Sequence, residues 1–280
     1  MKLERKFPQK RVLITGANSG FGKAMAMHFA RNGWRVAVTG RRPDAVRAAA
    51  ADVRAAGAAD VLELKLDVAS WEDFAAAARE VEAKWGGLDV LVNNAGILDS
   101  GKLGELSLER WHRMIDTNLW GVVHGCQAFL PLLLRQESGH VLNMASSAGI
   151  FALPEMANYS VPKAAVIALS ETMRAELGRH GIGVTVSCPA AFTSEILNKE
   201  GVDVAASVTL RSLEEDLKKG WHTSESVAAH AIRSMERNRL YDIAHFEMRA
   251  LWLAKRLLPE TSCRLFAWMY AKRIWRFKDA

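Results

Sequence analysis

The sequence predicts an α/β fold, in which a doubly wound parallel sheet of about seven strands has helices on both faces and a C-terminal helical extension. Short apolar runs alternate with longer helical patterns four times before residue 96. A glycine-rich turn directly follows the first of these runs. Polar residues follow the later runs, and the carboxyl ends of parallel strands meet at one edge, so these residues are expected to share a site.

The first strand and the turn after it predict nucleotide binding. Val12 to Thr15 is a short apolar run, and a glycine-rich turn from Thr15 to Gly22 leads into a helical pattern from Lys23 to Asn32. Glycines let a phosphate approach the backbone, and the helix N-terminus offers free N–H groups to it. A plain tight turn is the alternative, but the strand–turn–helix order favours a nucleotide.

The second predicted strand, Arg35 to Thr39, ends at Gly40-Arg41-Arg42. In a dinucleotide fold an acidic residue at this position binds the ribose 2′-hydroxyl, whereas an arginine accommodates a 2′-phosphate. The first carboxylate here is Asp44. The sequence therefore favours NADP(H) over NAD(H), with surface charges before a helix as the alternative interpretation of Arg41 and Arg42.

The rest of the first half continues the alternation. A helix from Pro43 to Ala56 and another from Trp71 to Trp85, capped by Ser70, flank a strand from Val61 to Leu66 that is followed by Asp67 and Val68. A fourth strand, Leu88 to Val92, is followed by Asn93-Asn94-Ala95-Gly96. Right-handed crossovers then give a Rossmann-type sheet with all these strand ends at one edge.

The second half repeats the pattern with longer helices. We expect strands at Val141–Ala145, Val184–Cys188 and Leu240–Ala244, and helices at Ser107–Leu134, Ala157–His180 and Glu225–Arg237. Asn118 stands in an apolar stretch of the first of these helices, where an amide is costly unless it is satisfied. The alternative to a functional role is that Asn118 bends the helix and binds a local partner.

Tyr159 and Lys163 are four residues apart, so they share one face of a helix, and Ser146 ends the strand before it. A free tyrosine has a pKa near 10, and a neighbouring cation lowers it, which makes a proton-transfer group. The Ser146 hydroxyl can bind a substrate oxygen. An aromatic ring packed under a solvated lysine is the alternative.

Composition narrows the function further. The chain has 280 residues, a formal charge of +6 and three widely spaced cysteines, which suit a reducing compartment rather than a disulfide framework. No secretory signal, spanning helix, nucleic-acid motif or metal-ligand spacing is expected. We therefore expect a cytoplasmic protein with no nucleic-acid partner.

With these residues in hand, the chain resembles the short-chain dehydrogenase/reductase family from about Arg11 to Ser194. Thr15-Gly16, Gly20 and Gly22 resemble its cofactor turn, and Asn93 to Gly96 its stabilising motif. Asn118, Ser146, Tyr159 and Lys163 match its catalytic four. The resemblance implies these cofactor-binding residues: Gly16, Asn18, Ser19, Gly20, Phe21, Gly22, Arg41, Arg42, Asp67, Val68, Asn94, Ala95, Gly96, Tyr159, Lys163, Pro189, Thr193 and Ser194.

The resemblance also implies a reaction, namely hydride transfer between a nicotinamide and a carbinol carbon. Tyr159 would donate or accept the hydroxyl proton, and Ser146 would orient the substrate oxygen. Lys163 would lower the tyrosine pKa and bind the nicotinamide ribose, while Asn118 would hold a proton-relaying water. The family forms dimers and tetramers, so a homodimer or homotetramer is expected.

The chain departs from the family pattern at three places. The usual Pro-Gly after the sixth strand is Pro189-Ala190, which puts in doubt any backbone shape that needs a positive φ at residue 190. Ser194 stands where threonine is common, and Thr193 could substitute for it. Pro162 lies inside the Tyr-x-x-x-Lys motif but leaves both catalytic positions intact.

Two segments concern the substrate. We expect residues 1–245 to form the catalytic domain, with residues of about 194–220 covering the substrate. An apolar wall is expected from Leu197, Val202, Val204, Val208, Leu210 and Leu213, and an ordinary surface helix pair is the alternative. A hydrophobic substrate is expected because the C-terminal tail, residues 246–280, comes from the end of the fold nearest this segment.

Residues 246–280 form the expected C-terminal extension, two helices broken near Pro259. Residues 249–280 hold eight Lys or Arg against two Asp or Glu, together with Trp252, Trp268 and Trp275. This composition suits a helix at a membrane surface, which would make the protein membrane-associated. The alternative, slightly favoured, is a tail packed on its own domain or a neighbouring subunit.

The sequence therefore predicts an NADP(H)-dependent oxidoreductase that interconverts a secondary alcohol and a ketone, or an alcohol and an aldehyde, on a hydrophobic substrate. The alternatives from other classes are a catalytically silent nucleotide-sensing protein and a membrane-peripheral scaffold of the same fold. The intact set of Asn118, Ser146, Tyr159 and Lys163 argues against both.

Overall fold

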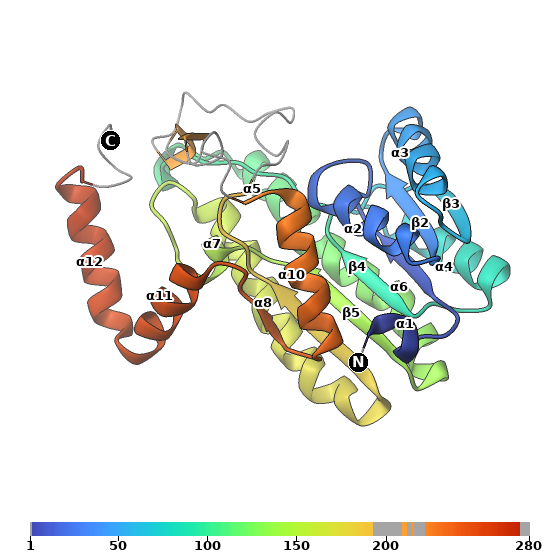
Figure 1. Ribbon diagram of the computed structural model, residues 1–280. Helices are drawn as coiled ribbons and strands as arrows, with labels where there is room; N and C mark the ends of the chain where they lie inside the picture. Colours follow the sequence, from blue (N-terminus) through green and yellow to red (C-terminus); the bar gives the residue numbers. More distant parts are fainter. Residues whose placement is uncertain (1, 193–208, 212–213, 216–221, 275–280) are drawn as a thin grey trace.

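The computed structural model describes residues 2–192, 209–211, 214–215 and 222–274 (Figure 1). Its centre is a seven-stranded sheet in the order β3-β2-β1-β4-β5-β6-β7, with every neighbouring pair parallel. The strands are β1 (Arg11–Ile14), β2 (Arg35–Gly40), β3 (Asp60–Lys65), β4 (Val90–Asn93), β5 (Gly139–Met144), β6 (Ile182–Ser187) and β7 (Tyr241–Asp242). The expected doubly wound sheet is confirmed.

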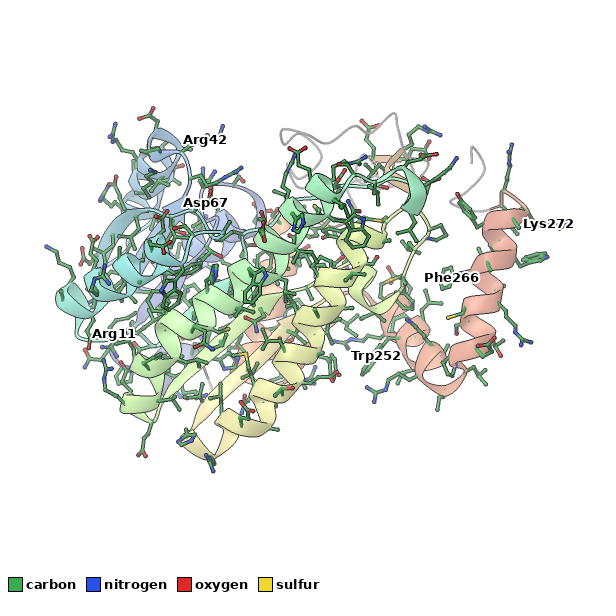
Figure 2. The ribbon with its side chains drawn as sticks, turned by 180° about the vertical axis from the view of Figure 1, so that it is seen from behind. Arg11, Arg42, Asp67, Trp252, Phe266 and Lys272 are labelled. Carbon is green, nitrogen blue, oxygen red and sulfur yellow. The ribbon has the colours of Figure 1, made fainter. Side chains whose placement is uncertain are left out.

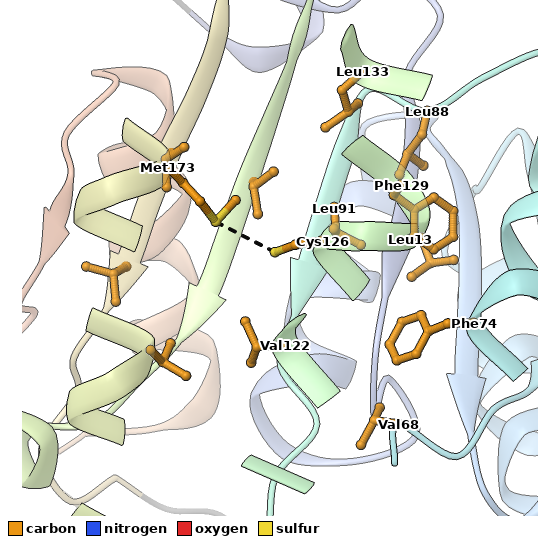
Figure 3. Packing of buried hydrophobic residues seen from close by; sticks show 14 of the residues in the cluster. Leu13, Val68, Phe74, Leu88, Leu91, Val122, Cys126, Phe129, Leu133 and Met173 are labelled. Atoms are coloured by element: carbon orange, nitrogen blue, oxygen red, sulfur yellow. Dashed lines mark hydrogen bonds between the residues drawn. The ribbon is translucent and has the colours of Figure 1, made fainter. Parts of the chain in front are cut away.

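Helices cover both faces of this sheet (Figure 1). One apolar cluster joins the sheet to α2 (Gly20–Arg31), α3 (Pro43–Ala55) and α10 (Ser224–Glu236). The other joins it to α4 (Trp71–Trp85), α6 (Gly121–Gln136) and α8 (Ala157–Leu177). Figure 3 shows Leu13, Phe74 and Phe129 packed in this second cluster. Strand β1 serves both cores because its side chains alternate, with Leu13 in one cluster and Val12 and Ile14 in the other.

The order of the strands fixes the position of the site. Strand β1 lies between β2 and β4, so the chain moves outward to β3 on one side and to β7 on the other. The segment that follows β1 and the segment that follows β4 leave the sheet on opposite faces at this point. A crevice forms there in doubly wound sheets, and ligands bind in it.

Local signals set most of the element boundaries. Helix α4 has the predicted bounds, because Ser70 Oγ accepts a hydrogen bond from Asp73 N at 3.1 Å and Gly86 ends the helix with a φ of 71°. The predicted single helix from Ser107 to Leu134 is instead three pieces. Helix α5 (Leu108–Ile115) and α6 are joined by a π-helical turn, η2 (Asp116–Trp120), which contains Asn118.

Three of the remaining short elements were not predicted, and the fourth, η3 (Gly178–His180), is a 3₁₀ turn at the end of the predicted helix Ala157–His180. Helix α1 (Leu3–Lys6) buries Leu3, and Phe7 after it meets the Trp34 ring edge-on at 6.4 Å. The other short pieces are η1 (Leu103–Glu105), α7 (Ser147–Ile150) and η3 (Gly178–His180). Each has four residues or fewer, too short for an apolar periodicity to show in the sequence.

The C-terminal extension forms two helices, α11 (Phe246–Leu257) and α12 (Pro259–Ala271), with the predicted break before Pro259. Figure 1 shows this hairpin standing at one end of the molecule, and Figure 2 shows Trp252 and Phe266 on the two helices. Both rings pack against the second apolar cluster, the one that contains Leu13, Phe74 and Phe129. Within the described ranges, none of the helices is long and apolar enough to cross a membrane.

Candidate active site

A cavity of about 620 Å³ opens at the carboxyl ends of the strands. Among the described residues named in the sequence analysis, all of the catalytic four and every cofactor residue except Gly22 line this cavity. Thr193 and Ser194, like the expected wall residues Leu197, Val202, Val204, Val208 and Leu213, lie outside the described residues. The structure therefore brings together side chains that are up to about 170 positions apart in the chain.

The glycine turn is shaped by close approaches to the end of β4. Gly16 has a φ of +64°, which favours glycine. A Cβ atom on Gly22 would lie 2.4 Å from Gly16 O and 2.5 Å from Asn94 Nδ2. Gly22 thus has a packing role behind the cavity wall, which explains why it does not line the cavity itself.

Thr15 and Asn94 connect the ends of β1 and β4. Thr15 Oγ1 accepts hydrogen bonds from the backbone N–H groups of Asn94 at 2.8 Å and Ala95 at 2.9 Å. In return, Asn94 Nδ2 donates to Thr15 O at 2.8 Å. These three bonds hold the two strand ends in one fixed arrangement beside the turn.

The N-terminus of α2 fits a bound phosphate. Its N-cap residue, Ser19, makes no side-chain capping bond, so its hydroxyl does not satisfy the first N–H groups of the helix. Gly20 and Phe21, the first two helical residues, line the cavity. With the close glycine packing beside them, these N–H groups would form a cradle for the pyrophosphate of a dinucleotide.

Two arginines lie at the far end of the same cavity. Arg41 and Arg42 are exposed and follow Gly40, the last residue of β2. Figure 2 shows Arg42 near Asp67, which follows β3. Asp44, the first carboxylate after β2, pairs with Arg47 at 3.4 Å on the surface of α3 and does not line the cavity. This end of the cavity therefore has cationic side chains where a ribose-binding carboxylate would stand.

The catalytic residues predicted on one helix face converge as expected. Lys163 Nζ donates to Met144 O at 2.9 Å and lies 5.8 Å from the centre of the Tyr159 ring. Both residues are buried on α8, and both line the cavity. Ser146, just after β5, caps α7 by accepting from Ala148 N at 3.1 Å. Its hydroxyl also shares a hydrogen bond with Tyr159.

The pKa of Tyr159 is shifted in the opposite direction from that expected. We expected the cation of Lys163 to lower it, but burial raises the pKa of the phenol, and the hydrogen bond with Ser146 lowers it by a smaller amount. Desolvation has the larger effect because the ring is only 8% exposed. The raised pKa means that the Tyr159 phenol keeps its proton at neutral pH.

A polar network that the sequence analysis missed anchors the helix that carries Tyr159. Asp99 Oδ2 accepts from Asn158 Nδ2 at 2.9 Å and from Arg110 Nε at 2.9 Å, and Asp99 Oδ1 accepts from Ser100 N at 2.9 Å. Asn158 directly precedes Tyr159 and is fully buried. No local sequence signal identifies this network, because its members come from three separate segments.

The alanine that replaces the usual glycine after β6 is tolerated. Ala190 is not among the described non-glycine residues with positive φ. Its N–H donates to His245 Nδ1 at 3.2 Å, which requires the neutral form of that ring. Burial lowers the pKa of His245 to about 4, so the ring is neutral at physiological pH. His245 was also missed, since it follows β7 more than fifty positions later.

The end of the cavity beside Tyr159 is apolar. Leu210, the one expected wall residue that the structure describes, is buried in a cluster with Ile97, Leu98, Met114, Met156 and Tyr159. Leu98, Leu153 and Met156 also line the cavity. Within the described ranges, no group of three or more side chains is placed to hold a metal ion.

Comparisons with known proteins agree with this geometry. A family model described as short chain dehydrogenase matches residues 10–204. The 3-oxoacyl-acyl-carrier-protein reductase FabG of Staphylococcus epidermidis is 36% identical over 190 residues, which are 68% of this chain and 78% of that protein. A short-chain dehydrogenase/reductase from Burkholderia phymatum in complex with NAD has a TM-score of 0.82 and 29% identity, covering 89% of this chain and 94% of its own. A short-chain dehydrogenase from Sphingobium yanoikuyae in complex with NADPH has a TM-score of 0.76 and 28% identity, covering 89% and 93%.

Proposed function

Because the chain belongs to the short-chain dehydrogenase/reductase family and is an NAD(P)-dependent oxidoreductase, we propose that it is an NADP(H)-dependent enzyme that interconverts a hydrophobic ketone or aldehyde with its alcohol. The observation that carries the proposal is the convergence of Ser146, Tyr159 and Lys163 at the apolar end of a cavity whose other end holds Arg41 and Arg42. The bound nicotinamide supplies or accepts the hydride.

The chain's own residues position the substrate and move the proton. Tyr159 donates its hydroxyl proton to the substrate oxygen during reduction and accepts it back during oxidation. Ser146 hydrogen-bonds that oxygen and fixes its orientation. Lys163, held by Met144 O at 2.9 Å, adds positive charge beside the phenol and favours the tyrosinate formed during reduction. Asn118 completes the proton path from Lys163 to solvent through a bound water.

The cofactor preference rests on Arg41 and Arg42. Both line the cavity after β2, and a guanidinium group binds a phosphate through two parallel hydrogen bonds. Replacing both with alanine is expected to weaken NADPH binding by at least about tenfold while NADH binding changes little, measured by fluorescence titration. Equal losses for the two cofactors would contradict the preference.

The substrate is proposed to be hydrophobic because of the surroundings of Tyr159. Its ring shares a buried cluster with Ile97, Leu98, Met156 and Leu210. An apolar substrate gains about 25 cal/mol of binding free energy for each Å² removed from water on such a surface.

The main alternative function, a nucleotide-sensing protein without turnover, is disfavoured because the four catalytic residues are intact and line one cavity.

The surface of the C-terminal hairpin supports a peripheral membrane contact. Of twelve large apolar side chains exposed among the described residues, seven lie on residues 246–271. Residues 246–274 also hold six Lys or Arg against two Glu. Apolar and basic side chains together suit an anionic lipid surface. Binding to anionic vesicles at low salt, lost in Leu257→Glu/Trp268→Glu, tests this contact, and no binding by the parent protein would contradict it.

Two further proposals concern the compartment in which the protein is found and its oligomeric state. The three cysteines are free thiols, which supports a reducing compartment such as the cytoplasm. A homodimer or homotetramer is proposed through the small and apolar side chains of α8, including Ala164, Ala165 and Ala168. Analytical ultracentrifugation tests this assembly, and a monomer at micromolar concentration would contradict it.

A further inference from the structure

A second cavity, of about 470 Å³, lies between the C-terminal hairpin and the segment that joins α7 to α8. We call it the hairpin groove. Its walls are mostly apolar and include Phe151, Leu153 and Val161 on one side and Cys263 and Phe266 on the other. Its volume falls within the range of about 300–1,000 Å³ that is usual for small-molecule sites.

The hairpin groove adjoins the candidate active site through one side chain. Leu153 lines both cavities. It packs against the cluster that contains Tyr159 and also against the cluster that contains Phe151. The two cavities therefore share a wall at Leu153, on the side of the candidate active site that contains Tyr159.

The groove is held open by contacts at both ends of the hairpin. Lys255 Nζ donates to Ile150 O, and Tyr270 Oη donates to Glu155 Oε1 at 3.1 Å. Between them, the rings of Phe151 and Phe266 lie 6.2 Å apart. The Glu155 backbone is fixed in turn, because its carbonyl accepts from Gly101 N at 2.7 Å and from Ser100 Oγ at 2.6 Å.

We propose that the hairpin groove binds the unbranched alkyl chain of the substrate while the carbonyl group lies beside Tyr159. This inference rests on the proposed function and narrows its substrate class to straight-chain ketones or aldehydes. The walls are mostly apolar, which favours a hydrocarbon, and the two charged residues that line the groove, Lys255 and Glu155, are already hydrogen-bonded to Ile150 O and Tyr270 Oη. The alkyl chain would reach the groove past Leu153, which lines both cavities. A second copy's hairpin is a poorer occupant, since six Lys or Arg against two Glu in residues 246–274 would meet like charge.

The first test is a chain-length series of 2-alkanones from four to twelve carbons with NADPH. Each methylene that enters the groove raises kcat/KM by up to about fourfold, because burying one methylene contributes about 0.8 kcal/mol. Ala267 lines the groove on α12, so Ala267→Trp fills it and lowers the ratio of long-chain to short-chain kcat/KM by at least about tenfold. Ala254→Trp is the matched control, since Ala254 is exposed on α11 and does not line the groove.

The second test needs no turnover. Cys263 lines the groove and is exposed, whereas Cys126 and Cys188 are buried. Burial raises the pKa of Cys126 to about 12 and also raises the pKa of Cys188, so neither reacts readily with maleimide. We expect 2-dodecanone to slow the labelling of Cys263 at least about fivefold, and 2-butanone at the same concentration to leave it unchanged. Mass spectrometry of the labelled peptide identifies the site.

The two readouts separate the inference from the proposed function. Protection of Cys263 without turnover of any ketone would support the groove and contradict the reductase proposal. Turnover that is independent of chain length, with no protection of Cys263, would overturn the groove and leave the reductase proposal standing. Slow labelling of Cys263 without any ligand would show that another copy of the chain covers the groove, which also contradicts the inference.

Discussion

Asn118 binds both backbone polar groups of Ile97: its Oδ1 accepts from Ile97 N at 3.1 Å, and its Nδ2 donates to Ile97 O at 3.0 Å. Asn118 is fully buried in the π-helical turn η2. Ile97 directly follows the Asn93 to Gly96 segment, so the amide fixes the chain where it leaves β4 and forms one wall of the cavity. Asn118 thus has a structural role in addition to the proton relay proposed for it.

Replacing Asn118 with leucine is expected to destabilise the fold. The substitution leaves the N–H and C=O groups of Ile97 buried without partners, at a cost of about 1–3 kcal/mol each. We expect the free energy of unfolding to fall by about 2–6 kcal/mol, measured by urea denaturation. A fall below about 0.5 kcal/mol would show that water or another group satisfies Ile97.

Gly22→Ala is expected to abolish cofactor binding. The added Cβ would lie 2.4 Å from Gly16 O and must displace the glycine turn. Gly178→Ala is the matched control, because no atom lies within 4 Å of a Cβ placed there. Titration of each variant with NADPH checks the expectation: parent-like affinity in Gly22→Ala would show that the turn does not hold the phosphates.

Asp89→Ala is expected to lower the free energy of unfolding by about 3–5 kcal/mol, because the buried Arg11 guanidinium loses its carboxylate and keeps only neutral partners, Trp85 O and Gln136 Oε1. Arg11 donates to Asp89 through Nη2 at 2.8 Å and through Nε at 3.2 Å, and both residues are buried. The double variant Arg11→Met/Asp89→Leu restores most of the loss, since neither charge then remains buried. A double variant as unstable as Asp89→Ala would contradict this.

The three tyrosines are expected to titrate together above their ordinary pKa. Burial raises the pKa of Tyr159 and of Tyr270, and burial with the neighbouring Glu171 raises the pKa of Tyr241 to about 12. A raised pKa means that the phenol keeps its proton to higher pH, so the tyrosinate absorbance of the cofactor-free protein rises at a higher pH than that of free tyrosine. An ionisation below pH 9 would contradict the direction of these shifts.

Addition of NADP⁺ provides the control for this titration. Tyr241 and Tyr270 do not line the candidate active site, so any tyrosinate that appears at lower pH with the cofactor comes from Tyr159. Tyr159→Phe removes this signal if the assignment is correct. The experiment also tests directly whether positive charge beside the phenol can reverse the effect of burial.

Much of the fold could be predicted because its signals are local. Ser70 and Gly86 mark both ends of α4, and Pro259 marks the break in the hairpin, since caps and breakers act within one turn. Helix η2 could not be predicted, and the partner of its buried Asn118 is Ile97, twenty-one positions away, which no local pattern indicates. The apolar periodicity continues through it unchanged.

The candidate site likewise has features that could be predicted from the sequence and features that could not. Tyr159 and Lys163 could be placed on one face because helix geometry fixes residues four apart. The sign of the Tyr159 pKa shift could not be predicted, because it depends on burial by side chains from several elements. Likewise, Asp99 meets Asn158 across 59 positions, and nothing near either residue in the sequence indicates the pairing.

Tyr159 is proposed to be the proton donor of an NADPH-dependent carbonyl reduction. The most direct measurement is the loss of NADPH absorbance with a panel of hydrophobic ketones and aldehydes, for the parent protein and for Tyr159→Phe. A positioned acid contributes about 10²–10⁴-fold, so we expect turnover by the parent and at least about a hundredfold lower kcat in the variant, with NADPH affinity within about threefold. Equal turnover by both proteins would contradict the role of Tyr159 as proton donor. No turnover by the parent, although NADPH binds, would contradict the proposed carbonyl reduction.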